Sequence, residues 1–257
     1  MAALLSAALA TLVFCAPGYP GAPGDAQPYV DQFAKAAVAA AGWEPGSLAA
    51  VYDPTEPGSV AKLGQPDAVL AFVPFPFFVE HSTQFHLVPL AQAVVAGAGR
   101  QERWKLVAKT GRVTGAASLA GYTILSVAGY APDFVRHSAL AQWTLPADVK
   151  IEATGQILSA LRRIASGERI VALLDYTQAA ALPTLPFAAQ LQTVTQSAEL
   201  PVAILATVDS RLPPARTHSF QAALLKMGHG GAGVEAMKSL QLQSFVLPRI
   251  PSVPPAP

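Results

Sequence analysis

Four apolar runs along the chain each end abruptly in a turn that carries an aromatic residue, and a helix-like segment follows each turn. Continuous apolar runs of this length are typical of strands buried on both faces, as in a parallel sheet covered by helices. Ligands of open α/β sheets bind beyond the carboxyl ends of such strands. Two junctions fall in each half of the chain, so the pattern predicts two sheets that face each other across one aromatic-lined cleft. The run and turn pairs are 12–15 with 16–20, 68–73 with 74–78, 123–127 with 128–132, and 170–174 with 175–177.

The segments between these junctions alternate between helical and strand patterns. We expect helices at 25–43, 58–63, 116–120, 132–142, 156–166 and 213–227, and further strands at 48–52, 149–153 and 202–208. The fold class is therefore α/β with two lobes.

The order of these segments predicts where each lobe begins and ends. If strand 202–208 returns the chain to the first lobe, that lobe is discontinuous and comprises 11–107 and 205–247, while 108–204 forms the second lobe. The two crossings, near 104–109 and 201–207, would then act as a hinge. The proline-rich residues 248–257 predict an extended tail.

The amino-acid composition indicates which classes of partner the chain can bind. The chain has 257 residues, 52% of them apolar, which is enough for two small hydrophobic cores. Charged residues make up 13% and the net charge is +1, so the chain lacks the electrostatic field that gathers nucleic acid or anionic membranes. We expect a monomer that binds a small molecule.

The amino-terminal region carries the one cysteine, Cys15, which excludes an internal disulfide and a multi-cysteine metal site. We expect a buried, unreactive thiol there. The bulky Phe14 before it argues against a lipoprotein anchor. Residues 1–10 end in a small-x-small pattern typical of an export cleavage site but lack a basic start, so they fit either a truncated signal sequence or a helix terminus.

Taken together, these segments resemble the periplasmic solute-binding proteins of ABC transporters, in the branch that includes the phosphonate-binding proteins. The resemblance covers roughly residues 11–248, and its most specific part is Leu224-Leu225-Lys226-Met227, followed by a glycine-rich gap, a short helix and Phe245-Val246. It implies a type II periplasmic binding protein fold, a hinge, and capture of a ligand by closure without chemistry. It also implies a periplasmic location and a membrane permease or another carrier as partner.

One departure from this family concerns the turn at 127–132. Phosphonate-binding relatives usually offer a turn rich in Ser, Thr and Gly at a helix start in the second lobe, where hydroxyl and N–H groups hold the anion. This chain has Val-Ala-Gly-Tyr-Ala-Pro there, and Pro132 has no N–H to donate. No Lys or Arg lies in the four junctions. A hydrophobic ligand such as a sterol or lipid, and a sensory or interaction domain that has lost transport, therefore stay open as alternatives.

The candidate ligand-binding residues all lie in the four turns. Glycines would permit sharp turns near the ligand, tyrosines supply both apolar surface and a hydrogen bond, and the acidic turn can cap a helix or contact the ligand. Pro74 and Pro76 predict that the phenylalanines occupy a loop, where they form either satellite core or a ligand wall. The candidates are Gly18, Tyr19, Phe75, Phe77, Phe78, Gly129, Tyr130, Asp175, Tyr176 and Thr177.

Two short motifs resemble those of serine acyl-transfer enzymes. Residues 59–62 match Ser-x-x-Lys and residues 109–111 match Lys-Thr-Gly, but the connecting Ser-Asp-Asn element is missing because the chain has no asparagine. The five histidines lack HxH or HExxH spacing, and no glycine-rich phosphate loop is present. We therefore expect a protein that is not an enzyme and that uses no metal or cofactor.

Overall fold

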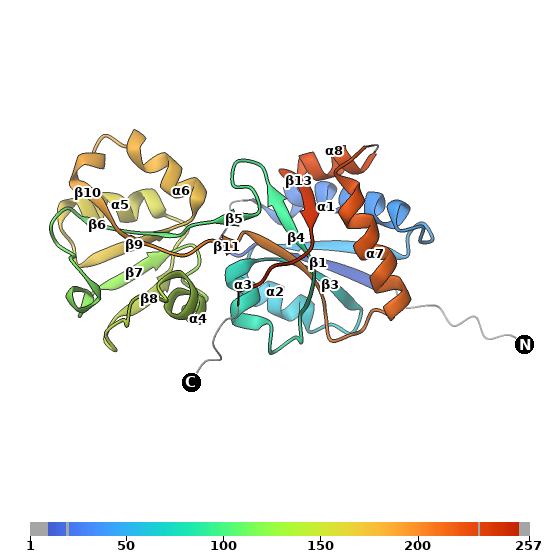
Figure 1. The fold of residues 1–257 in the computed structure, drawn as a ribbon, viewed down its shortest axis with the longest axis horizontal. Helices are drawn as coiled ribbons and strands as arrows, with labels where there is room; N and C mark the ends of the chain where they lie inside the picture. The colour runs from blue at the N-terminus through green and yellow to red at the C-terminus, as the bar shows by residue number, and fades with distance from the viewer. Residues whose placement is uncertain (1–9, 19–20, 231, 252–257) are drawn as a thin grey trace, which may run out of the picture.

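The computed structural model describes residues 10–18, 21–230 and 232–251, which form two lobes side by side, each built around its own sheet (Figure 1). In lobe 1, β2, β1 and β3 are parallel, while β12, β4 and β13 continue the sheet antiparallel. The six strands, in spatial order, are β13 (Leu242–Val246), β4 (Val88–Val95), β12 (Ala203–Thr207), β3 (Ala68–Pro74), β1 (Ala10–Cys15) and β2 (Leu48–Asp53).

Helices cover both faces of the lobe 1 sheet. One face packs against α1 (Pro23–Ala40), α7 (Pro214–Met227) and α8 (Ala232–Ser239). The other face packs against α2 (Glu56–Leu63) and α3 (Phe75–His81). This is the two-sided burial that the continuous apolar runs predict.

Lobe 2 contains a five-stranded sheet that, like the first, combines parallel and antiparallel strands. Its strands β8, β7 and β9 are parallel, and β6 and β10 continue it antiparallel. In spatial order the strands are β10 (Leu191–Gln196), β6 (Lys105–Lys109), β9 (Ile170–Leu174), β7 (Thr123–Ser126) and β8 (Lys150–Ala153). The helical segments are η1 (Ala116–Leu119), α4 (Pro132–Phe134), the π-helix η2 (Val135–Ala139), α5 (Ile157–Ser166), α6 (Tyr176–Ala181), η3 (Leu182–Thr184) and η4 (Ala188–Gln190).

The chain passes between the lobes at two short strands, β5 (Gln101–Glu102) and β11 (Leu200–Pro201), which pair antiparallel (Figure 1). Lys105–Lys109, which the sequence places at the first crossing, is strand β6 of the lobe 2 sheet. Ala203–Thr207, near the second crossing, is strand β12 of the lobe 1 sheet.

The residues of β1 illustrate how the runs build the core. Leu12 and Phe14 join the cluster under α1 and α7, whereas Val13 and Cys15 point to the opposite face. Successive side chains of a strand alternate between faces, so a strand covered on both sides must be apolar at every position. All six residues of β1 are buried.

Two predicted local structures are wrong. The phenylalanines of residues 75–78 lie in helix α3 and not in a loop, because Pro76 falls in the first helical turn, where its missing N–H has no intrahelical acceptor. The predicted helix at 132–142 is a single turn, α4, followed by a five-residue π-helix. The predicted helix at 213–227 is confirmed as α7.

Parts of two predictions fall outside the described residues. The signal remnant covers 1–10, of which only Ala10, the first residue of β1, is described. Tyr19 is also outside. Within the described start of the tail, Arg249 N–H donates to the side-chain carbonyl of Gln92 at 3.3 Å.

Candidate functional site

A cavity of about 780 Å³, open to solvent on one side, lies between the two lobes at the carboxyl ends of their parallel strands. Lobe 2 contributes the turns after β7, β8 and β9 and the start of α5, while lobe 1 contributes the turn after β1 and the loop between α8 and β13. Four of the candidate residues line this cavity together: Gly18, Asp175, Tyr176 and Thr177.

The Asp175 turn forms one wall of this cavity. Asp175 Oδ1 accepts the N–H of Gln178 at 2.8 Å, and the Gln178 side chain reaches back to the N–H of Asp175, which makes a capping box at the start of α6. Burial raises the pKa of the Asp175 carboxyl, while the N–H groups of Gln178 and Thr177 act in the opposite direction. The carboxylate therefore holds the wall in place, and Tyr176 and Thr177 beside it face the cavity.

Gly18 brings the lobes into direct contact at the cavity edge. Its φ is +85°, and a Cβ there would lie 2.7 Å from the carbonyl oxygen of Val127 in lobe 2. Both facts require glycine, because other residues rarely adopt this backbone and have a side chain that would push the lobes apart. Gly18 thus permits the close approach of the β1 and β7 turns.

Six further residues line the cavity that the sequence did not indicate as ligand contacts. They are Val127, Gly155, Ile157, Leu158, Gln178 and Gln241. Gly155 and Leu158 belong to a fifth strand-to-helix junction, between β8 and α5, which lacks the aromatic residue that marked the other four. Gln241 carries no sequence signal, since it reaches the cavity from a left-handed turn with φ of 57° before β13.

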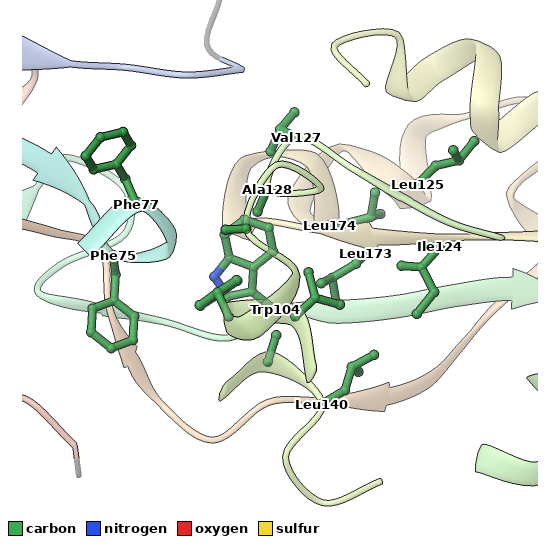
Figure 2. Close-up of a cluster of buried hydrophobic side chains, with 14 of the residues drawn as sticks. Phe75, Phe77, Trp104, Ile124, Leu125, Val127, Ala128, Leu140, Leu173 and Leu174 are labelled. Atoms are coloured by element: carbon green, nitrogen blue, oxygen red, sulfur yellow. The ribbon is translucent and has the colours of Figure 1, made fainter. Parts of the chain in front are cut away.

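The candidate phenylalanines take part in a contact between the lobes. Phe75 and Phe77 are fully buried and Phe78 is 7% exposed. Figure 2 shows Phe75 and Phe77 on the lobe 1 side of Trp104 and the apolar side chains of lobe 2. The Phe75 ring meets Phe134 of α4 edge to face, with centroids 6.1 Å apart. These rings fill the space where α3 and α4 face each other.

A polar contact accompanies these rings. Glu80 on α3 accepts the N–H of Asp133, the second residue of α4, at 3.2 Å. Burial raises the pKa of the Glu80 carboxyl, and the N–H of Asp133 acts in the opposite direction. A carboxylate of lobe 1 therefore caps the start of a lobe 2 helix.

Gly129 and Tyr130 lie beside this contact and are not among the cavity-lining residues. A Cβ on Gly129 would collide with the backbone of Glu152 and Ala153, so the glycine lets the β7 turn pack against β8. The Tyr130 ring is partly buried, with its centroid 6.4 Å from that of Phe77.

The two enzyme-like motifs lie in different lobes. Ser59 is fully buried on α2, and its hydroxyl donates to the carbonyl of Asp53 at 3.5 Å. Lys62 forms an ion pair with the Asp53 carboxylate, whereas Lys109 ends β6 of lobe 2. Cys15 is buried beside Ser59 and Asp53, and this burial raises the pKa of its thiol to about 12.

The described residues contain neither a metal-binding cluster nor a membrane-spanning helix. Within residues 10–18, 21–230 and 232–251, no group of three His, Cys, Asp or Glu side chains is placed to hold a metal ion. No helix in the same part of the chain has the length and hydropathy of a membrane span.

Comparisons with known proteins rest on structure. No family model and no curated protein sequence matches the chain. Among solved structures, XAC2383 from Xanthomonas citri bound to chloride matches with a TM-score of 0.70 at 15% identity, over 94% of this chain and 92% of that one. The binding protein of an ABC phosphonate transporter, PA3383 from Pseudomonas aeruginosa, matches at 0.60 and 15% identity over 93% and 82%.

A third match is PhnD1 from Prochlorococcus marinus in complex with methylphosphonate, with a TM-score of 0.58 and 12% identity over 93% of each chain. At these identities the likeness establishes the fold. The resemblance read from the sequence is confirmed at that level, and so is the predicted α/β class. The chain has the two-lobed fold of the type II periplasmic binding proteins.

Proposed function

We propose that this chain is a solute-binding protein that captures a small ligand in the cavity between its lobes, without chemistry, and delivers it to a transporter permease or another carrier in the periplasm. The observation that carries the proposal is the position of the 780 Å³ cavity, at the carboxyl ends of parallel strands from both sheets. A ligand there touches both lobes and so favours their closed arrangement.

The lining of the cavity favours a ligand that is neutral and partly apolar. None of its described lining residues is Lys or Arg, and the carboxylate of Asp175 is already engaged with backbone N–H groups. Tyr176, Thr177 and Gln241 offer hydroxyl and amide groups. Leu158, at the start of α5, keeps 47% of its surface exposed, which is the kind of surface that a ligand's apolar part covers.

The start of α4 supports the same ligand class. Phosphonate-binding relatives are expected to hold their anion at a helix start in the second lobe, but here Glu80 of the protein already accepts the Asp133 N–H. A phosphonate at the start of α4 would be repelled by the Glu80 carboxylate. A hydrophobic ligand such as a sterol or lipid is the runner-up, and the exposed Leu158 is the observation that favours it.

Native mass spectrometry of the protein purified from its host would test the proposal, because a bound solute appears as added mass. The identified solute is then titrated into Leu158→Ser and into Leu247→Ser, a matched control that is 61% exposed outside the cavity lining. We expect weaker binding for the first variant alone, by roughly tenfold. Equal affinities of the two variants would show that the solute does not bind in this cavity. Sub-micromolar binding of a simple alkylphosphonate would contradict a neutral ligand.

A further inference from the structure

A second cavity, of about 410 Å³, lies where the chain crosses between the lobes. Both crossings contribute to it, through Glu102 and Arg103 on the first and Glu199 on the second. Helix α6 of lobe 2 contributes Tyr176 and Ala180. Tyr176 lines this cavity and the one between the sheets, so the two share a wall.

Glu102 is the unusual residue of this hinge cavity. It is 5% exposed, and its carboxylate accepts the N–H of Tyr176 at 3.3 Å. Burial raises the pKa of Glu102 to about 8 and the nearby Asp175 carboxylate adds to this shift, while the N–H of Tyr176 and the indole of Trp104 act in the opposite direction. In the part of the chain that the structure describes, no ion pair includes Glu102.

The cations of the cavity do not neutralise this carboxylate. Arg103 donates to the carbonyl of Ser197 at 3.1 Å and pairs with Glu199 at 3.3 Å. Lys105 also lines the cavity, yet the charge that acts on the Glu102 carboxyl is the repulsive one of Asp175. A buried carboxylate without a counter-charge is costly, and such groups in cavities are candidates for ligand contact.

We propose that the hinge cavity is a second binding site, for a small organic cation with N–H donors such as an ammonium or guanidinium group, held by the carboxylate of Glu102. Such a cation supplies both the missing charge and charge-assisted hydrogen bonds. Because the site includes both crossings, its occupant also touches the segments that move when the lobes open. The chemistry of this site does not depend on which ligand the larger cavity binds, although the two cavities share Tyr176.

Calorimetric titration with methylguanidinium tests this proposal, since the probe stays charged at every pH used. Only the ionised carboxylate pairs with the cation, so we expect the wild type to bind about tenfold more tightly at pH 9 than at pH 7. Tetramethylammonium, which has the charge but no N–H donor, should bind more weakly.

Three variants locate the site. Glu102→Gln should lose at least tenfold in affinity at pH 9 and lose the pH dependence, whereas Glu199→Gln, an exposed carboxylate of the same cavity, should keep both. Ala180→Leu places bulk in the cavity at an exposed helix position, so it should block binding without disturbing the core. The proposal is overturned if the wild type does not bind, if Glu102→Gln binds as the wild type does, or if affinity is independent of pH.

Discussion

Replacing Glu102 by glutamine should stabilise the protein, and by an amount that grows with pH. A carboxyl that is buried without a cation holds its proton more tightly in the folded chain than in the unfolded one. The pKa of Glu102 rises from an ordinary 4.5 to about 8 on folding, so its contribution to stability is lost as pH rises through that window. Glutamine keeps an acceptor for the N–H of Tyr176 and carries no charge.

The size of this stabilisation follows from the difference between the pKa values of Glu102 in the unfolded and folded chain. A difference of about 3.5 pKa units at about 1.4 kcal/mol each corresponds to about 5 kcal/mol of lost stability at pH 9 relative to a neutral side chain. At pH 7, where most of the folded molecules still hold the proton, the corresponding loss is about 3 kcal/mol, and at pH 5 it is under about 1 kcal/mol.

Urea unfolding followed by circular dichroism at pH 5, 7 and 9 measures these differences. We expect the wild type and Glu102→Gln to unfold at nearly the same urea concentration at pH 5 and to diverge as pH rises. Glu199→Gln serves as the control, because Glu199 is exposed and paired with Arg103. A gap between the wild type and Glu102→Gln that stays constant with pH would show that the carboxyl titrates normally, and would refute the reasoning.

Three further predictions concern the cleft. Gly18→Ala should cost about 1–3 kcal/mol in urea unfolding from backbone strain, and should enlarge the radius of gyration in small-angle scattering, because the added Cβ meets Val127; an unchanged radius would contradict this contact. Tyr176→Ala should weaken binding of the native solute by roughly tenfold to a hundredfold in calorimetry, whereas Tyr29→Ala, on the exposed face of α1, should not; equal effects would exclude Tyr176 from the site. Phe134→Leu should loosen the aromatic contact between α3 and α4 and enlarge the radius in scattering, while circular dichroism reports intact lobes; an unchanged radius would mean that this contact does not set the lobe arrangement.

The central strands could be predicted from the sequence because burial on both faces leaves a continuous apolar run. Leu12 to Cys15 is such a run, and the structure buries it between helices on either side. Strand β10, Leu191–Gln196, could not be found in this way, because it lies at the edge of its sheet and most of its residues are partly or fully exposed. An edge strand need not carry a continuous apolar run, and the polar residues Gln192, Thr193, Thr195 and Gln196 leave none in β10.

The site was predictable only where it coincides with a marked junction. The turn at Asp175, Tyr176 and Thr177 follows a buried strand, and the structure places all three at the cavity. Leu158 and Gln241 reach the same cavity from a helix start and from a left-handed turn. Their position depends on how the lobes fold against each other, which local residue patterns do not encode.

The aromatic junction after β3 forms a contact between the lobes that is separate from the cavity. Pro76 is compatible with the first turn of a helix, so the phenylalanines are carried on α3 and directed against α4. There the Glu80 carboxylate accepts the N–H of Asp133 across the lobes. A side chain of the protein thus occupies the start of α4, which an anion could otherwise use. The cavity lies away from this contact, at the turns that follow β1, β7, β8 and β9.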